Sequence, residues 1–225
     1  MRGGLVVSCQ APEGSPLAAT EHLVALAMAA EAGGASGIRA EGSDRVAAIK
    51  YAVALPVIGL RKRTVTGSDV YITPELEDAR AVDASGADIV AVDATLRSRP
   101  GGVDSARFLA ELARQVAKPV LADVDSLDAG LAAEAAGAAA VATTLSGYTG
   151  EGPPPERPDL ELVARLAARL DCPVLAEGRY ATPEAVHQAF EAGAWAVVVG
   201  AAITDPVALT RRFAAAGERR AHVAR

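Results

Sequence analysis

Residues 173–200, PVLAEGRYATPEAVHQAFEAGAWAVVVG, show the unit from which the whole chain is built. An apolar run ends in a polar tip at Glu177-Gly178-Arg179, a stretch of helical composition follows, and an Ala-Gly pair leads into the next apolar run. Runs that are apolar on both faces are typical of parallel strands covered by helices. The segment therefore predicts a strand, a loop, a helix and a second, parallel strand.

The same unit recurs along the chain. Strands are predicted near residues 4–9, 36–39, 56–60, 88–93, 119–123, 139–144, 173–177 and 196–200, and helices over 20–32, 43–51, 74–85, 104–116, 126–136, 159–170, 182–192 and 206–215. Eight strand–helix units in 225 residues predict an α/β fold, a single (β/α)8 TIM barrel with parallel strands. We expect residues 1–217 to form this barrel and residues 218–225 to form a charged C-terminal tail. The proline-rich segment 151–158 is expected to be a long loop on the face of the strand tips.

The composition narrows the class of protein. With a net charge of −6 and no Lys/Arg-rich cluster interleaved with aromatics, the chain lacks the surface of a general nucleic-acid binder. Cys9 and Cys172 are too few for a disulfide framework and lack metal-ligand spacing, and the histidines lie away from the strand tips, so no metal site is expected. No apolar stretch approaches the ~20 residues of a membrane span, and the N-terminus lacks a signal-peptide pattern. We expect a cytoplasmic protein with neither nucleic-acid nor membrane partners.

The tip after the third apolar run carries a candidate catalytic lysine. Two-residue alternation in VIGLRKR, residues 57–63, places Lys62 on the same face as Leu60 and Arg61 on the other face. An ammonium at the barrel mouth, flanked by Arg61 and Arg63, would lose its proton more easily than in water, which suits a base or a Schiff-base nucleophile. The alternative is that Lys62 belongs to a solvated basic turn.

The tip after the seventh apolar run carries a candidate carboxylic acid. Alternation puts Glu177 on the face of Leu175, and a carboxyl in an apolar rim has a raised pKa and can act as a general acid. The alternative is a structural pair between Glu177 and an arginine or lysine inside the barrel.

Glycines after the seventh and eighth apolar runs indicate where an anion would bind. In many barrels a phosphate lies at this position, and Gly178-Arg179 and Gly200-Ala201-Ala202 are placed for it. Asp93 and Asp123 also follow strands, where they are expected to hold hydroxyl groups, orient the lysine or cap a helix.

Five motifs resemble one enzyme family. They are GGLVVSCQ at 3–10, VYITP at 70–74, DAT at 93–95, TTLSGYT at 143–149 and AEGR at 176–179. In order, from about residue 2 to about residue 213, the chain resembles the bacterial N-acetylmannosamine-6-phosphate 2-epimerases. The resemblance implies conversion of N-acetylmannosamine 6-phosphate to N-acetylglucosamine 6-phosphate, in sialic acid and N-acetylmannosamine catabolism, by removal and return of the C2 proton.

The resemblance also implies roles for individual residues. Lys62 matches the family's lysine that works at C2, and Glu177 matches its carboxyl acid/base. The remaining matches are substrate-binding positions: Gln10, Arg39 and Asp123 hold the sugar and assist ring opening, and Tyr148 and Arg179 fall in motifs near the substrate. Gly178, Gly200 and Ala201 are expected to bind the substrate because they follow the seventh and eighth apolar runs, at the phosphate end. Epimerisation without redox change needs neither nicotinamide nor metal, so no cofactor is expected. The partner is a phosphosugar substrate, and the family suggests a homodimer.

One departure from the family pattern concerns the phosphate end. The family usually has glycine at the position of Ala201 and a basic residue, typically arginine, at that of Asp205. Three explanations are open: Arg179 and backbone amides suffice, Arg211 or Arg212 compensates, or the substrate differs.

Two other functions are kept as alternatives. One is a different sugar-phosphate barrel isomerase or lyase that uses Lys62 as a Schiff base. The other is a non-catalytic protein that binds an amino-sugar phosphate, although pure binding does not require a paired base and acid.

Overall fold

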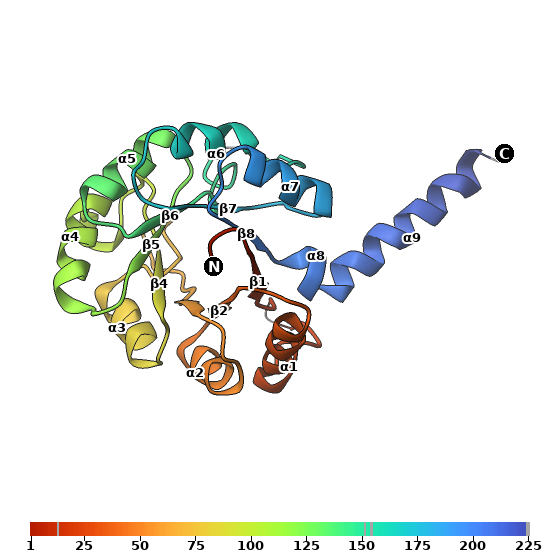
Figure 1. The fold of residues 1–225 in the computed structure, drawn as a ribbon, viewed down its shortest axis with the longest axis horizontal. Helices are drawn as coiled ribbons and strands as arrows, with labels where there is room; N and C mark the ends of the chain where they lie inside the picture. The colour runs from red at the N-terminus through yellow and green to blue at the C-terminus, as the bar shows by residue number, and fades with distance from the viewer. Residues whose placement is uncertain (13, 151, 154, 224–225) are drawn as a thin grey trace.

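Eight parallel strands close into a barrel in the order in which they occur in the chain (Figure 1). The computed structural model describes residues 1–12, 14–150, 152–153 and 155–223, the side chains of 217–223 excepted. The strands are β1 (Leu5–Cys9), β2 (Gly37–Glu41), β3 (Val57–Leu60), β4 (Ile89–Asp93), β5 (Val120–Asp123), β6 (Ala140–Ala142), β7 (Val174–Glu177) and β8 (Ala196–Val199). β1 pairs with both β2 and β8, which closes the sheet. The predicted (β/α)8 barrel is confirmed.

Helices follow the strands and surround the barrel. They are α1 (Thr20–Ala32), α2 (Ser43–Ala52), α3 (Leu76–Ala84), α4 (Ser105–Gln115), α5 (Leu127–Ala135), α6 (Leu160–Ala167), α7 (Pro183–Glu191), α8 (Ala201–Thr204) and α9 (Pro206–Val223), with a 3-10 turn, η1 (Pro100–Gly102). Several helices have an N-cap side chain that accepts a hydrogen bond from a backbone N–H of the first turn. Asp104 accepts from the N–H of Arg107 in α4, and Ser126 accepts from the N–H of Ala129 in α5. These caps fix where each helix starts relative to its strand.

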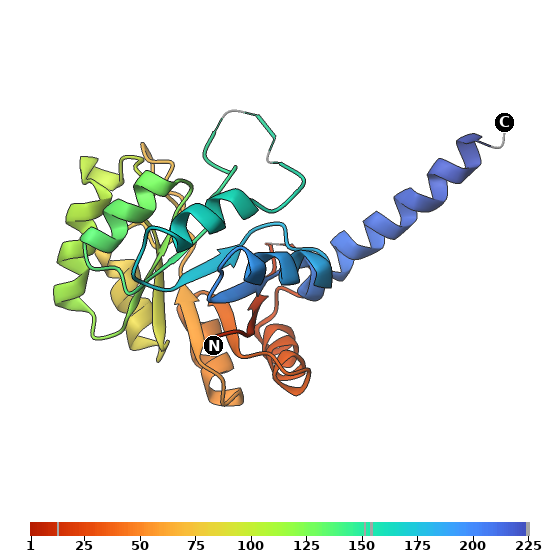
Figure 2. The same cartoon turned by 45° about the horizontal axis from the view of Figure 1, so that its top comes forward.

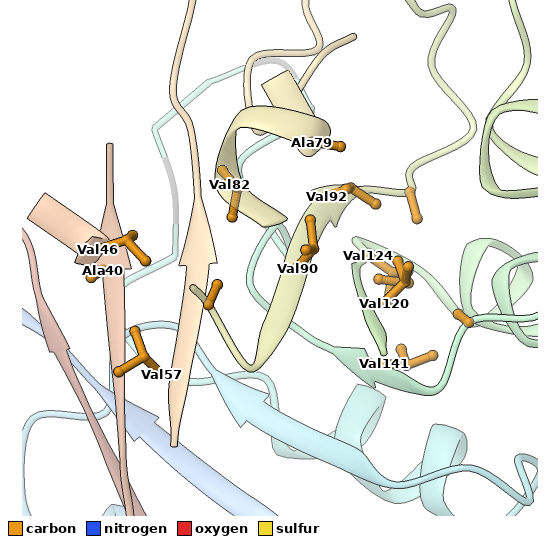
Figure 3. Packing of buried hydrophobic residues seen from close by; sticks show 14 of the residues in the cluster. Ala40, Val46, Val57, Ala79, Val82, Val90, Val92, Val120, Val124 and Val141 are labelled. Atoms are coloured by element: carbon orange, nitrogen blue, oxygen red, sulfur yellow. The ribbon is translucent and has the colours of Figure 1, made fainter. Parts of the chain in front are cut away.

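Two apolar layers lie on the two sides of the sheet. Outward-facing strand residues pack against the helices, as Val90 and Val92 of β4 do with Val82 of α3 in Figure 3. Inward-facing residues, among them Leu60 and Leu121, fill the barrel axis. The barrel interior is therefore packed with apolar side chains, and in folds of this kind a ligand binds at the carboxyl ends of the strands.

The described residues between β6 and α6 extend from the barrel as a long loop (Figure 2). The described part of 151–158, residues 152–153 and 155–158, lies outside helices and strands, in agreement with the predicted loop. Glu151 and Pro154 lie outside the described residues.

The final helix is longer than predicted. α9 runs from Pro206 to Val223 instead of ending at residue 215, and Figures 1 and 2 show it leading away from the barrel. The division into a barrel, 1–217, and a tail, 218–225, stays a prediction. No helix in the described part of the chain is long and apolar enough to cross a membrane.

Candidate active site

Alternation along the strands turns the polar side chains to one mouth of the barrel. In β7, Val174 and Ala176 pack in the helix-facing layers, so Leu175 and Glu177 face the axis. The same alternation directs other side chains at or just beyond the strand ends to this mouth: Ser8, Gln10, Arg39, Lys62, Asp93, Asp123 and Thr144. The strands thus supply both the packed core and the site.

A buried arginine joins two carboxyl groups at the base of the mouth. Arg39 donates to Asp123 through both terminal nitrogens, Nη1 to Oδ1 at 3.0 Å and Nη2 to Oδ2 at 2.7 Å. Its Nη1 also lies 3.1 Å from Glu177 Oε2. Arg39 is 1% exposed, Asp123 0% and Glu177 14%, so this is a shielded charge cluster with one carboxyl at its open edge. Glu177 therefore pairs with an arginine inside the barrel, as one of the two expectations had it, and its carboxyl group also lies at the mouth.

Thr144, which the sequence analysis did not single out as a site residue, links the two carboxyl groups. Its Oγ1 lies 2.6 Å from Asp123 Oδ1 and 3.1 Å from Glu177 Oε2. A hydroxyl has one proton to donate, so Thr144 can serve one carboxylate fully or both weakly. The backbone of Glu177 is held separately, because its N–H donates to Thr143 Oγ1 at 3.0 Å.

Burial shifts the proton affinities in the cluster. Burial raises the pKa of Glu177; the positive charge of Arg39 opposes this rise and the negative charge of Asp123 adds to it. Burial alone would lower the pKa of Arg39, but Asp123 and Glu177 outweigh it and raise the pKa above its ordinary value. Arg39 therefore stays charged, while Glu177 binds a proton more readily than a glutamate in water.

Lys62 lies two residues after the end of β3, and its backbone forms an antiparallel β-bridge with Ile72. Its side chain is exposed at the mouth, yet enough protein surrounds the ammonium that burial is the main cause of a lowered pKa. The charge of Arg39 lowers this pKa further, against Glu177, which raises it. Lys62 is therefore easier to deprotonate than a lysine in water.

The source of the positive charge beside Lys62 differs from the expectation. Arg61 and Arg63 turn outward to α3, where Arg61 lies 3.4 Å from Asp78 and Arg63 2.9 Å from it. The cation that acts on Lys62 is Arg39, which is distant in sequence. The pKa of Lys62 is lowered, as expected, but the expectation that the flanking arginines lower it was wrong.

Two neighbouring cavities open at the mouth and share Ser8, Gly200 and Ala201 in their walls. The first, about 420 Å³, is lined by residues that include Tyr71, Thr144, Tyr148, Glu177, Gly178, Arg179 and Arg212. The second, about 830 Å³, is lined by residues that include Gln10, Glu41, Lys62 and Asp205. Nearly all of the predicted site residues line one of these cavities, and Arg39 and Asp123 lie buried beside Glu177.

Asp93 is used locally. Its Oδ1 accepts from Thr95 N–H at 3.0 Å and from Thr95 Oγ1 at 2.7 Å, and its Oδ2 pairs with Arg97 at 2.7 Å. Its carboxyl oxygens are therefore engaged by Thr95 and Arg97, and a role for Asp93 toward a substrate hydroxyl or the lysine stays a prediction. Within the described residues, no three His, Cys, Asp or Glu side chains are grouped to hold a metal ion.

Comparisons with known proteins identify the family. A family model described as "Putative N-acetylmannosamine-6-phosphate epimerase" matches residues 23–219. The chain is 48% identical over 214 residues to the "Putative N-acetylmannosamine-6-phosphate 2-epimerase" of Caldanaerobacter subterraneus subsp. tengcongensis, with 95% of this chain and 90% of that protein covered. The chain belongs to the N-acetylmannosamine-6-phosphate 2-epimerase family. The predicted family resemblance is confirmed.

Further relatives of the epimerase agree. The solved structure of the N-acetylmannosamine-6-phosphate 2-epimerase from Clostridium perfringens superimposes with a TM-score of 0.90 at 37% identity, covering 95% of this chain and 93% of that chain. The "Bifunctional enzyme NanE/NanK" of Brucella melitensis is 51% identical over 213 residues, which are 95% of this chain and 40% of that protein. Membership makes the protein a phosphosugar epimerase of sialic acid catabolism.

Two residues at the mouth of the epimerase barrel, Thr144 and Tyr71, were not among the expected site residues. Thr144 had a usable signal, because it lies two positions beyond the inward-facing Ala142. Tyr71 lines the first cavity from the segment after β3, and burial raises its pKa. Of the two arginines offered by the sequence as a compensating cation, Arg212 of α9 lines the first cavity and Arg211 does not.

Proposed function

We propose that Lys62 and Glu177 perform the two proton transfers by which this epimerase inverts C2 of N-acetylmannosamine 6-phosphate. The observation that carries the proposal is their placement. They extend from β3 and β7, which are four strands apart in a closed barrel of eight and so lie across the axis from each other. Inversion by two fixed groups needs one of them on each face of C2, and this arrangement offers such a pair.

The pKa directions fit this division of labour. A lowered pKa makes the neutral amine of Lys62 easier to reach, and a raised pKa makes the protonated carboxyl of Glu177 easier to reach. In the open-chain sugar the C1 carbonyl makes the C2 proton acidic, so the amine takes that proton and the electron pair of the C2–H bond moves toward the C1 oxygen, which gives an enolate. Glu177 then gives its proton to the opposite face of C2. Proton return from the ammonium to the carboxylate, through water, restores the enzyme; the reverse reaction uses the same groups in opposite roles.

The surrounding residues stabilise the intermediate. The ammonium formed on Lys62 and the fixed charge of Arg39 are the positive groups that would stabilise negative charge on the C1 oxygen of the enolate. Asp123, held by Arg39, keeps that guanidinium in place, and Gln10 reaches the second cavity to bind sugar hydroxyls. Such a mechanism calls for no cofactor.

The phosphate end lies after β7 and β8. Gly178, Arg179, Gly200 and Ala201 line the first cavity there, and Tyr148 forms its outer wall, 5.2 Å from the Arg179 guanidinium. Gly178 has a φ of 114°, which other residues rarely adopt, so its backbone can turn at this point. We place the sugar across the shared wall of the two cavities, with its phosphate in the first.

The test is proton NMR in deuterated water with N-acetylmannosamine 6-phosphate. Deuterium at C2 together with the gluco epimer is expected for the native protein. Lys62→Ala and Glu177→Ala are each expected to lose at least about 100-fold of this activity while the circular dichroism spectrum stays unchanged. Near-normal turnover in either variant would remove that residue from the mechanism.

The same sample separates the alternative chemistries. Borohydride trapping of a covalent substrate adduct at Lys62 would favour a Schiff-base isomerase or lyase. Tight binding without C2 exchange would favour a non-catalytic binding protein.

Assembly and location complete the proposal. We infer a homodimer because α9 leads away from its own barrel, with Phe213 79% exposed on it. Sedimentation of the native protein and of Phe213→Asp tests this inference, since a dimer held by α9 would dissociate in the variant. A cytoplasmic location is tested by cell fractionation.

A further inference from the structure

We infer that Arg212 of α9 is the cation that binds the substrate's phosphate and sets the preference for a phosphorylated sugar. The inference rests on the proposed function, because it assigns the phosphate to the first cavity.

The geometry of α9 turns one face of the helix into that cavity. Ala208, Leu209 and Arg212 all line it, and positions three and four apart lie on the same side of a helix. Arg212 therefore shares a cavity with Glu177, the proposed proton donor. A sugar that reaches Glu177 can place its other end near this guanidinium.

The second arginine of the cavity is already engaged. Arg179 donates from Nε to the carbonyl of Arg157 at 2.7 Å and from Nη1 to the carbonyl of Ser146 at 2.6 Å. It also faces the ring of Tyr148. These contacts fix Arg179 between the β6–α6 and β7–α7 loops, and they leave only part of its guanidinium for a ligand.

Arg212 is available for an anion. Its side chain is exposed, and it makes no side-chain hydrogen bond or ion pair with any residue that the structure describes. A guanidinium offers five donors in a planar fork that matches two phosphate oxygens at once. A phosphate monoester is close to a dianion at neutral pH, so a second positive group beside Arg179 balances its charge.

The carboxylate of Asp205 does not compete for this position. Its Oδ1 accepts from Ala208 N–H at 2.9 Å, which caps the first turn of α9, and it lines the second cavity instead of the first. Asp205 thus starts the helix that carries Arg212 seven residues later. Among the explanations for the unusual Asp205, compensation by Arg212 is the one that this geometry favours.

The experiment measures binding by calorimetry, and the phosphosugar is supplied as the equilibrium mixture of its two C2 epimers, so that net turnover contributes no heat. Native protein, Arg212→Ala and Arg211→Ala are titrated with N-acetylmannosamine 6-phosphate, with N-acetylmannosamine and with inorganic phosphate. Arg211 is the matched control, because it is the exposed neighbour on α9 but does not line the first cavity. Arg212→Lys tests whether charge alone suffices.

We expect Arg212→Ala to weaken binding of the phosphosugar by about 10- to 100-fold, and to reduce the affinity ratio between phosphorylated and plain sugar by a similar factor. Arg212→Lys should recover part of that loss, and Arg211→Ala should bind within about threefold of the native protein. Equal affinities of Arg212→Ala and Arg211→Ala for the phosphosugar would overturn the inference. C2 deuterium exchange, measured separately on the native protein, reports on the proposed function alone.

Discussion

Replacing Thr144 by valine removes one hydroxyl and keeps the shape of the side chain. That hydroxyl lies 2.6 Å from Asp123 and 3.1 Å from Glu177, so the valine leaves both carboxyl groups without their shared donor. A hydrogen bond to a charged group contributes about 1.5–3 kcal/mol. At a factor of ten for each ~1.4 kcal/mol, the expected loss in kcat is about 10- to 150-fold.

The pH profile distinguishes positioning from simple loss of structure. The Thr144 hydroxyl favours the ionised form of Glu177, so without it the pKa of Glu177 rises further. The limb of the kcat/KM profile that reports Glu177 should move to higher pH in Thr144→Val and stay in place in Thr144→Ser. The assay is C2 deuterium exchange across pH. A Thr144→Val enzyme within about threefold of native kcat, with an unmoved profile and equal thermal stability, would refute the reasoning.

Two further predictions concern stability. Burial raises the pKa of Glu177 in the folded protein, so protonated Glu177 contributes to stability fully below the ordinary glutamate pKa, and this contribution is lost as the pH rises through the folded-state pKa. The melting temperature of Glu177→Gln relative to that of the native protein should therefore increase from pH 4 to pH 8. A difference that does not change with pH would contradict this. Gly59→Ala would place a Cβ 2.7 Å from Val82 Cγ1 and 2.8 Å from Ala87 Cβ, so α3 must shift at a cost of about 1–3 kcal/mol. The melting temperature of Gly59→Ala should fall by about 2–12 °C, and adding Val82→Ala to the same chain should restore part of the loss. An unchanged melting temperature in Gly59→Ala would contradict this, because it would mean that α3 can shift without a cost in stability.

Strand positions could be predicted closely, because the apolar runs are bounded by glycine, proline and polar residues. The predicted strands 56–60 and 173–177 match β3 and β7 to within one residue. Helix ends were less certain: α6 ends at Ala167 instead of residue 170, and α9 continues past residue 215. No local signal fixed those ends, since alanine-rich sequence continues a helix as readily as it ends one.

The site could be predicted where it depends on alternation within a strand. Lys62 and Glu177 follow inward-facing residues, and the structure places both at the mouth. The bond between Arg39 and Asp123 joins residues 84 apart, and no pattern within either strand reports it. Arg212 depends on where α9 points after Asp205, which is a property of the assembled barrel.

Pairing of the first strand with the last means that the barrel can close only when nearly the whole chain has been synthesised. Leu5 pairs with Val197, and the hydroxyl of Thr204 donates to the carbonyl of Ser8. Until β8 has left the ribosome, β1 and the newest strand each expose a row of unpaired N–H and C=O groups, and pairing over such a separation is slow. A truncated nascent chain thus has two edges to which other chains can add. The mouth, which draws on β2, β3, β5 and β7, gains its closed geometry only with the last strand.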